Sequence, residues 1–233
     1  MVQRILPVTT CYVGTQDAKK GFAFAKRAFD IVVSLVMIVA LLPLLLVLAA
    51  ISAVDTKGCP LFAQTRMGRN NQPFKMLKFR TMNVNAPANV ATHKLRDAAR
   101  YISPVGEVLR KFSLDELPQL FNILKGDMSM VGPRPERQVI ADQYAEEIPE
   151  FVLRTKVKAG LTGYAQVYGK YNTTPYDKLK FDITYIENYS LWLDVKIMLL
   201  TFKILFQKEN TEGVDEAQQT ALKDQESDTG IKR

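Results

Sequence analysis

The chain has 233 residues, which is enough for one domain with a sizeable hydrophobic core, and its formal net charge is +7. Its two cysteines, Cys11 and Cys59, form no C-x-x-C pair, and His93 is its only histidine. These counts give no sign of a disulfide framework or a zinc site, and they exclude a histidine-rich metal site. The charge is uneven, because residues 207–233 carry −3 and the rest of the chain carries +10. A body of that charge favours nucleic acid, an anionic membrane surface or a phosphorylated ligand as its partner.

An uncharged apolar run follows a mixed leader, residues 1–30, which ends close after the basic pair Lys26 and Arg27. The run covers residues 31–54, and a straight helix of that length would just cross a hydrocarbon core of about 30 Å. Pro43 removes a backbone hydrogen bond near its middle and kinks or breaks a helix there. Two topologies remain open: a kinked spanning helix, or a re-entrant helix that breaks at Pro43. Basic residues on both sides of the run favour the re-entrant form, since the positive-inside rule keeps both flanks in the cytoplasm.

Two short alternating runs come next, at residues 60–66 and 74–80, with Gly, Asn and Pro between them. This pattern predicts a β-hairpin with a long turn. One face of the second run carries Lys78 and Arg80, and Arg80 is a candidate phosphate contact; a solvated surface arginine is the alternative. Residues 82–99 show no clear period, and we expect loop and short helix there.

Charged and turn residues are densest over residues 110–135, RKFSLDELPQLFNILKGDMSMVGPRP. Ser113 and Glu116 have the spacing of a capping box, which would begin a helix at Ser113. Pro118 argues against that start, because its missing N–H and its ring destabilise a helix interior. A helix over residues 117–125 suits the proline better, and a glycine then ends it.

This later helix start places Asp115 and Glu116 at the helix N-terminus. On a helix two neighbouring side chains diverge by about 100°, so both serve one reactive centre only if they have different partners. One carboxylate could attack phosphorus as a nucleophile while the other holds Mg²⁺ against a diphosphate. Arg110 and Arg134 would supply bidentate phosphate contacts.

The last apolar segment, residues 191–206, has Lys196 and Lys203 on one helix face and Trp192 near its start. Such a helix could lie in the membrane interface, or it could be buried against the domain, and the pattern leaves both open.

Asp182 and Tyr185 lie one helical turn apart in the segment before it. We interpret them as core residues in preference to site residues. The polar residues 207–233 are expected to be disordered.

Several motifs resemble the bacterial sugar transferase family, the small monotopic phosphoglycosyl transferases, over about residues 26–206. They are KRAFD, QTRMGRNNQPFKMLKFRTM, SLDELPQL, GDMSMVGPRP and KAGLTGYAQVYGKYN. The resemblance implies an α+β fold: a mostly helical cytosolic domain with a β-hairpin, anchored by a re-entrant membrane helix broken at Pro43. It also implies a location on the cytoplasmic face of the bacterial inner membrane.

The activity that the resemblance implies is transfer of a sugar 1-phosphate from a UDP-sugar to polyprenyl (undecaprenyl) phosphate, with release of UMP. This would be the first membrane step of capsule, exopolysaccharide or glycoprotein glycan synthesis. Asp115 matches the nucleophile that forms a covalent aspartyl phosphosugar, and Glu116 matches its partner on Mg²⁺. Arg110 matches the arginine at the polyprenyl phosphate, and Arg134 the arginine at the donor phosphates. Residues 166–170 read QVYGK where many relatives have QVNGR, and a lysine cannot form the planar fork of an arginine.

The expected organisation is a leader at 1–30, a membrane helix at 31–54, a catalytic domain at 55–206 and a tail at 207–233. With a short leader, this would be the small form of the family. The competing hypothesis is a non-catalytic, membrane-tethered basic adaptor that binds anionic lipid or nucleic acid. An acidic pair inside the basic region argues against it, since carboxylates weaken phosphate binding. The expected partners are a UDP-sugar, polyprenyl phosphate and membrane lipids, without nucleic acid, and a dimer is left open.

Overall fold

The computed structural model describes residues 16–83, 101–169 and 173–205, with side chains from residue 21 onward. The expectations for the first residues of the leader, for most of the loop at 82–99, for Lys170 and for the tail lie outside these ranges. The elements in order are α1 (Gln16–Thr56), β1 (Leu61–Met67), η1 (Arg69–Asn71), β2 (Pro73–Phe79), α2 (Pro104–Lys111), η4 (Leu114–Glu116), α3 (Gln119–Lys125), β3 (Ser129–Val131), α4 (Gln138–Glu147), η5 (Pro149–Lys156), β4 (Gly160–Thr162), α5 (Tyr164–Tyr168), α6 (Pro175–Glu187) and α7 (Leu191–Leu205).

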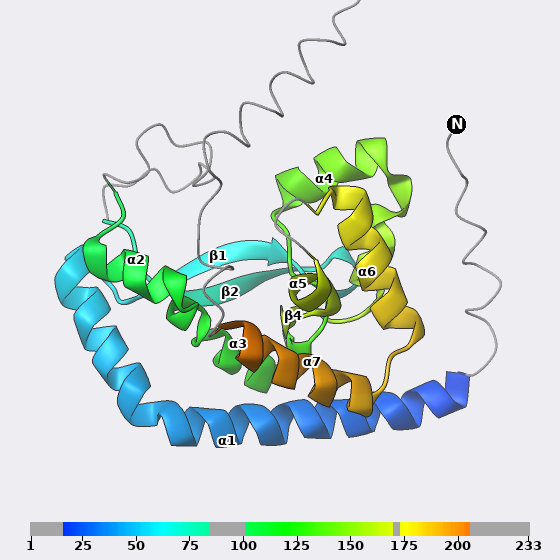
Figure 1. Cartoon of the computed structure of the whole chain (residues 1–233), viewed down its shortest axis with the longest axis horizontal. Helices are drawn as coiled ribbons and strands as arrows, with labels where there is room; N and C mark the ends of the chain where they lie inside the picture. The colour runs from blue at the N-terminus through cyan, green and yellow to red at the C-terminus, as the bar shows by residue number, and fades with distance from the viewer. Residues whose placement is uncertain (1–15, 84–100, 170–172, 206–233) are drawn as a thin grey trace, which may run out of the picture.

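The predicted hairpin is confirmed. Strands β1 and β2 pair antiparallel from Leu61 opposite Phe79 to Met67 opposite Pro73. The turn between them contains Asn70 and Asn71 in the left-handed region, with φ of 54° and 59°, which asparagine tolerates better than most residues. The mostly helical character is confirmed as well (Figure 1).

A second sheet of two very short parallel strands, β3 and β4, was not predicted. It depends on close backbone approach at glycines, because a Cβ on Gly160 would lie 2.1 Å from the backbone N of Gly132. Only glycine fits at such a distance. The sheet directs the chain from β3 into the turn that carries Arg134.

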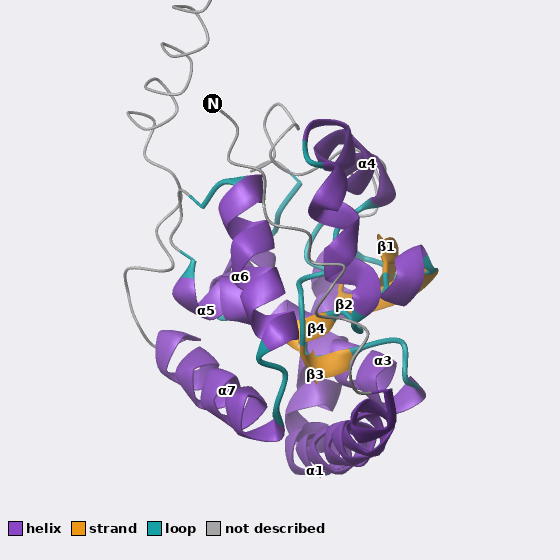
Figure 2. Cartoon of the chain, turned by 90° about the vertical axis from the view of Figure 1, so that its right-hand side faces the viewer, coloured by secondary structure: helices purple, strands orange, loops and turns teal. Residues whose placement is uncertain are grey.

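The main core forms around α3 and β3. Leu120 and Ile123 of α3 are fully buried, and Met130 of β3 is 4% exposed. Helix α1 adds Ile38 to this cluster and α7 adds Ile197. A second cluster joins α1 to the hairpin and α2, through Leu45, Leu48, Phe79 and Leu109. Figure 2 shows α1 end-on at the base of the molecule, with α7 and α3 on either side and the short strands above it.

Helix α1 is longer than the predicted membrane segment, and the predicted break at Pro43 is wrong. The helix is continuous from Gln16 to Thr56 with Pro43 inside it. Figure 1 shows it bending between a long first part and a shorter second part, as a proline that removes a helix hydrogen bond explains. Within the described residues it is the one helix long and apolar enough to cross a membrane. Its outer face is bare: Val36 is 61% exposed and Leu46 is 64% exposed.

The two ends of the apolar run within α1 are bonded to the domain. Directly before the run, Asp30 accepts hydrogen bonds from Ser129 Oγ at 3.2 Å and from the backbone N of Met130 at 3.1 Å. Near its end, Ser52 Oγ donates to the backbone O of Arg80 at 2.7 Å, and Ser103 Oγ donates to the Asp55 carboxylate. The helix therefore lies along the domain over most of its length.

The sequence suggested that the basic pair before the apolar run forms a juxtamembrane cluster. In the structure, both side chains are instead bonded to the domain. Lys26 is 3% exposed, and its Nζ lies 2.6 Å from Asp30 and 3.0 Å from Asp194. Arg27 donates to the carbonyl oxygens of Ile123 at 2.6 Å and Leu124 at 2.8 Å, in the last turn of α3. These charges hold α1 on the domain.

Helix α7 is buried on one face and exposed on the other. Asp194 and Ile197 are fully buried, whereas Trp192 is 78% exposed and Leu199 is 68% exposed. The buried face packs on the main core, as one interpretation of the sequence expected. The exposed face also carries both lysines, and its position in a membrane interface stays a prediction.

Asp182 and Tyr185 are both 1% exposed, in agreement with their interpretation as core residues. Their partners differ. The Tyr185 hydroxyl donates to Asp194 Oδ1 at 2.7 Å, and Asp182 Oδ2 lies 2.7 Å from Arg154 Nη2.

Candidate active site

The acidic pair lies in η4, the single 3₁₀ turn directly before α3. Ser113 precedes this turn in the left-handed region, with φ of 54°, and its side chain makes no capping hydrogen bond. The capping box is therefore absent, and α3 begins at Gln119 with Pro118 just before it. The predicted later helix start is correct to within two residues, and Gly126 ends the helix with φ of 105°.

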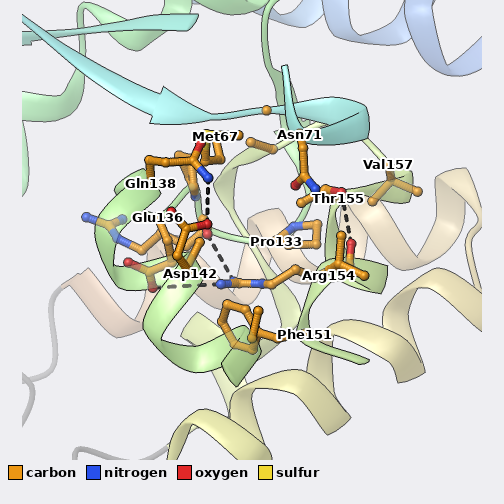
Figure 3. A pocket seen from close by; sticks show the side chains of 17 residues that line it. Met67, Asn71, Pro133, Glu136, Gln138, Asp142, Phe151, Arg154, Thr155 and Val157 are labelled. Atoms are coloured by element: carbon orange, nitrogen blue, oxygen red, sulfur yellow. Dashed lines mark hydrogen bonds and ion pairs between the residues drawn. The ribbon is translucent and has the colours of Figure 1, made fainter. Parts of the chain in front are cut away.

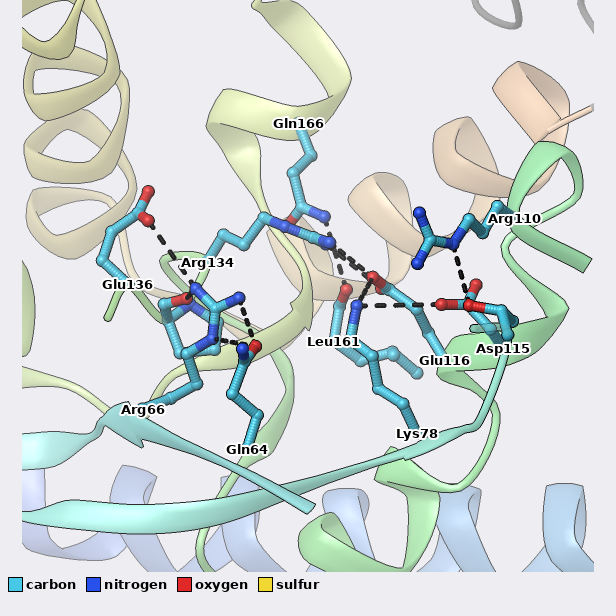
Figure 4. Close-up of polar contacts among 12 residues, drawn as sticks. Gln64, Arg66, Lys78, Arg110, Asp115, Glu116, Arg134, Glu136, Leu161 and Gln166 are labelled. Carbon is cyan, nitrogen blue, oxygen red and sulfur yellow. Dashed lines mark hydrogen bonds and ion pairs between the residues drawn. The ribbon is translucent and has the colours of Figure 1, made fainter. Parts of the chain in front are cut away.

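Glu116 connects three segments of the chain. Lys78 Nζ of the hairpin donates to its Oε1 at 2.7 Å. Arg134 of the turn after β3 donates to both of its oxygens, with 3.1 Å from Nη1 to Oε2. Burial alone would raise the pKa of Glu116, but the charges and hydrogen bonds of Arg134 and Lys78 outweigh it and hold the pKa at about 2. Glu116 is therefore ionised at neutral pH, and Figure 4 shows it between its two cationic partners.

Asp115 is held less tightly than its neighbour. It is 8% exposed, and its Oδ2 lies 3.9 Å from Lys78 Nζ. Burial raises its pKa, and the positive charge of Lys78 partly offsets that effect. A nucleophile needs an ionised group whose lone pairs are not committed to strong partners. Asp115 has fewer strong partners than Glu116, which fits the role of nucleophile that the resemblance implies for it; that role stays a prediction.

Arg110 approaches from α2. Its Nε donates to Thr81 Oγ1 at 2.8 Å, and it is near enough to Asp115 for the carboxylate charge to act on its pKa. Burial lowers the pKa of Arg110 and Asp115 opposes that effect, so the guanidinium remains charged at neutral pH. Asp115 thus has cations on two sides, Lys78 and Arg110.

Arg134 lies in a turn whose backbone is held by hydrogen bonds from two other arginines. Arg154 Nη2 donates to the backbone O of Arg134 at 3.0 Å, and Arg66 Nη1 donates to the backbone O of Pro135 at 3.3 Å. Arg154 is itself held by Asp182, with 2.9 Å from Nε to Oδ2. The side chain of Arg134 is 45% exposed, so it is fixed at its backbone and partly open to solvent.

A small pocket of about 70 Å³ lies behind this turn, between η1, α4 and η5. Figure 3 shows Arg154 crossing it near Glu136 and Phe151. The Arg154 guanidinium lies 4.7 Å from the centre of the Phe151 ring and 3.8 Å from Glu136 Oε1. The pocket therefore contains the supports of the Arg134 turn.

The structure brings four of the five predicted site residues together: Asp115, Glu116, Arg110 and Arg134 (Figure 4). The fifth, Arg80, has other partners. Its Nε donates to the backbone O of Cys59 at 2.9 Å, and its guanidinium lies 5.7 Å from the centre of the Phe62 ring. Its role as a phosphate contact stays a prediction.

Lys78 occupies the place expected for Arg80, and sequence reasoning did not select it. The alternation of β2 put both residues on one face, which was the available signal. That pattern does not show whether Lys78 or Arg80 reaches η4, because this depends on where β2 ends relative to α3. Arg66 and Arg154 were also missed, since their partners are distant in sequence.

The expected Mg²⁺ has few candidate ligands. Among the described residues, no three His, Cys, Asp or Glu side chains are grouped to hold a metal by themselves. A Mg²⁺ ion that shares substrate phosphates needs only one or two carboxylates, and Glu116 is the carboxylate expected to bind it. Because Glu116 already binds Lys78 and Arg134, the residues fit a cation that brings phosphate ligands with it, and do not form a site of their own.

A buried carboxylate pair among lysine and arginine side chains, beside a long apolar helix, agrees with the family that the motifs resemble. The sequence model of the bacterial sugar transferase family matches residues 22–208, and the chain belongs to this family.

Several similar proteins are named for sugar phosphate transfer to undecaprenyl phosphate or for exopolysaccharide production. A UDP-glucose:undecaprenyl-phosphate glucose-1-phosphate transferase from Caulobacter vibrioides is 40% identical over 190 residues, which cover 79% of this chain and 71% of the relative. A UDP-N-acetylgalactosamine-undecaprenyl-phosphate N-acetylgalactosaminephosphotransferase from Aeromonas hydrophila is 40% identical over 187 residues, 79% of this chain and 44% of the relative. The exopolysaccharide production protein ExoY from Sinorhizobium fredii is 38% identical over 192 residues, 76% of this chain and 83% of the relative. The chain therefore spans less than half the length of the Aeromonas protein and most of the Sinorhizobium protein.

Proposed function

We propose that the protein transfers a sugar 1-phosphate from a UDP-sugar to undecaprenyl phosphate at the cytoplasmic face of the bacterial inner membrane. The observation that carries the proposal is Asp115, a buried carboxylate with Lys78 and Arg110 beside it and Arg134 close by. Such a centre suits a reaction in which a carboxylate attacks phosphorus while cations bind the other phosphate oxygens. The substrates named for the relatives are of this kind. An adaptor would not need the acidic pair, which neutralises its cations.

In the proposed first step, Asp115 attacks the phosphorus that carries the sugar. An aspartyl phosphosugar forms, the bond from that phosphorus to the bridging oxygen of the diphosphate breaks, and UMP leaves with that oxygen. In the second step, an oxygen of undecaprenyl phosphate attacks the same phosphorus. The bond to Asp115 breaks, the carboxylate is regenerated, and the sugar is left on a lipid diphosphate.

The surrounding residues have separate roles in this scheme. Lys78 favours the ionised form of Asp115, because its charge lowers the pKa that burial raises. Arg134, whose side chain is partly exposed, binds donor phosphates, and Arg110 binds the acceptor phosphate. Glu116 would hold Mg²⁺, which when bound neutralises the charge of the diphosphate. Donor phosphates compete with Glu116 for Arg134, so donor binding would free the carboxylate for the metal.

The site and the membrane are brought together by α1, for which we propose the re-entrant topology. Two observations support it: both ends of its apolar run bond to one domain, and its outer face is apolar along the helix. If the helix spanned the bilayer, its two ends would lie on opposite membrane surfaces, about 30 Å or more apart, and one domain could not bind both of them. This arrangement would keep the lipid phosphate at the membrane surface near Asp115.

Asp115→Asn tests the chemistry. Purified protein in detergent or nanodiscs is given Mg²⁺ and a panel of UDP-sugars, first without acceptor and then with undecaprenyl phosphate. The wild type should release a burst of UMP without acceptor and retain the labelled sugar phosphate covalently, whereas Asp115→Asn should do neither. Asp127→Asn is the matched control, since Asp127 pairs with Lys125, whose side chain is 75% exposed, and accepts a further, long hydrogen bond of 3.4 Å from Asn122. Full UMP release by Asp115→Asn would rule out the mechanism, and unchanged turnover in excess EDTA would remove Mg²⁺ from it.

The natural cysteines test the topology, because Cys11 precedes α1 and Cys59, which is exposed, follows it. Single-cysteine variants, Cys11→Ser and Cys59→Ser, are treated in spheroplasts with a membrane-impermeant maleimide before and after permeabilisation. Both thiols should react only after permeabilisation. Reaction of Cys11 from outside would show that α1 spans the bilayer.

A further inference from the structure

We propose that Thr81 is a positioning residue that orients Arg110 for the acceptor phosphate; this rests on the proposed function. Thr81 lies two residues after β2, is 5% exposed, and its Oγ1 accepts a hydrogen bond from Arg110 Nε at 2.8 Å. Neither the sequence motifs nor the relatives give this residue a role. The contact joins the end of the hairpin to the last turn of α2.

The position of α2 over Thr81 is fixed by Gly106. A Cβ at Gly106 would lie 2.3 Å from the backbone O of Thr81, so only glycine allows the helix to come this close. Ser103 begins the helix by accepting a hydrogen bond from the backbone N of Gly106 at 2.9 Å. Arg110 is four residues beyond Gly106 and hence on the same helix face. Its guanidinium therefore comes to lie at the Thr81 side chain.

Thr81 is itself held on both sides. The backbone O of Arg80, the preceding residue, accepts a hydrogen bond from Ser52 Oγ at 2.7 Å. The following residue, Met82, forms an antiparallel bridge with Ile102. The hydroxyl is thus a fixed acceptor, and the guanidinium it holds loses rotational freedom before any ligand binds.

The choice of Nε decides which part of Arg110 remains for a ligand. With Nε committed to Thr81, the two terminal nitrogens stay available, and Figure 4 draws no contact from either of them. A phosphate can bind both terminal nitrogens end-on, with two parallel hydrogen bonds. Figure 4 shows Arg110 and Asp115 next to each other, so a phosphate bound to Arg110 would lie close to the aspartyl phosphosugar.

A hydroxyl is also the right kind of partner chemically. It orients the guanidinium without neutralising it, whereas a carboxylate would cancel part of its charge and repel a phosphate. Arg134 shows the contrast, since Glu116 binds both of its terminal nitrogens. Of these two arginines, Arg110 is the one whose terminal nitrogens are not bonded to a carboxylate of the described residues.

Thr81→Val keeps the shape of the side chain and removes the acceptor. We expect the KM for undecaprenyl phosphate to rise roughly tenfold, the effect of losing one hydrogen bond to a charged group. The KM for the UDP-sugar and the UMP burst without acceptor should not change, because Arg110 acts in the second step. Thr81→Ser, which restores the hydroxyl, should return the acceptor KM to within about twofold of the wild type.

Double variants separate a role through Arg110 from a general loss of structure. Arg110→Met should raise the acceptor KM, and adding Thr81→Val should then have no further effect. Additive effects of the two changes would overturn the proposal, as would an equal rise in the UDP-sugar KM. If Thr81→Val does not fold, Thr81→Ala is tested in the same way, with Thr81→Ser as its reference.

The test of Thr81 can fail separately from the test of the proposed transferase activity. If the wild type gives no UMP burst with any UDP-sugar, the proposed function fails. If the burst is normal and Thr81→Val leaves the acceptor KM unchanged, only the role of Thr81 fails.

Discussion

Replacing Lys78 with methionine should raise the pKa of Asp115 and move the acid limb of the activity profile to higher pH. Lys78 Nζ lies 3.9 Å from Asp115 Oδ2 and 2.7 Å from Glu116 Oε1. Methionine keeps a long apolar stem at this position and removes only the charge. Asp115 would then be buried beside Glu116 with one cation fewer, and both burial and the neighbouring carboxylate raise its pKa.

The size of the effect follows from the geometry. Two unit charges about 4 Å apart interact by about 4 kcal/mol at an effective dielectric constant of about 20. Glu116 shares the charge of Lys78 at shorter range, so only a part of this energy acts on Asp115. About 1.4 kcal/mol corresponds to one pKa unit, and we expect the acid limb to move by roughly one pH unit or more.

The assay is the pH dependence of kcat/KM for UMP release, from about pH 5 to pH 9. Lys78→Arg keeps the charge and should leave the limb near its wild-type position. Lys75→Met is the matched control on the same strand, because Lys75 is exposed and bonds Thr65 instead. A limb that stays in place in Lys78→Met while activity remains measurable would refute the reasoning, as would an equal displacement in Lys75→Met.

Three further predictions concern stability and membrane binding. Because the pKa of Glu116 is lowered from 4.5 to about 2, its ionisation stabilises the fold above pH 4.5, and this contribution is lost as the pH falls to 2. Between these limits, acid titrations followed by circular dichroism should show the wild type losing about 3 kcal/mol more than Glu116→Gln, and parallel curves would contradict this. Ile123→Ala, in the fully buried centre of α3, should lower the free energy of unfolding by about 2–5 kcal/mol in denaturant titrations; a loss below about 1 kcal/mol would argue against this core. Trp192→Gln with Leu199→Gln, two exposed positions of α7, should weaken sedimentation with anionic vesicles while the melting temperature stays unchanged, and unchanged sedimentation would exclude that face from the membrane.

The parts of the fold that the sequence could predict have local causes. The hairpin is encoded by alternation in two runs and by turn residues between them, and its pairing confirms both. The limits of α3 follow from Pro118 and Gly126, each of which has a backbone requirement that few positions satisfy. Strands β3 and β4, with three residues each, are too short for any period to show.

The parts that it could not predict depend on partners far away in the chain. Lys26 and Asp30 have the appearance of charges that flank a membrane segment. They are buried because Asp194, near the other end of the domain, completes their ion pairs. No sequence pattern near Lys26 indicates that Asp194 is its partner. The start of α1 and its attachment to the domain therefore could not be predicted from the local sequence.

For the site, the same distinction separates what was predicted from what was missed. Asp115, Glu116, Arg110 and Arg134 lie in one dense stretch of sequence, and the structure folds that stretch around a single centre. Lys78 comes from another element, and its choice over Arg80 is decided by three-dimensional packing.

The attachment of Asp30 to β3 has a consequence for any change made to α1. The hydrogen bond that Asp30 accepts from the backbone N of Met130 makes α1 a structural neighbour of the strand that leads to Arg134. Ile38, Leu45 and Leu48 of the same helix fill both hydrophobic clusters. Removing α1, or exchanging it for an unrelated helix, would take away part of the interior and one support of the turn that carries Arg134. In the membrane-bound arrangement that we propose, the depth of α1 in the bilayer and the height of Arg134 above it would therefore be set together.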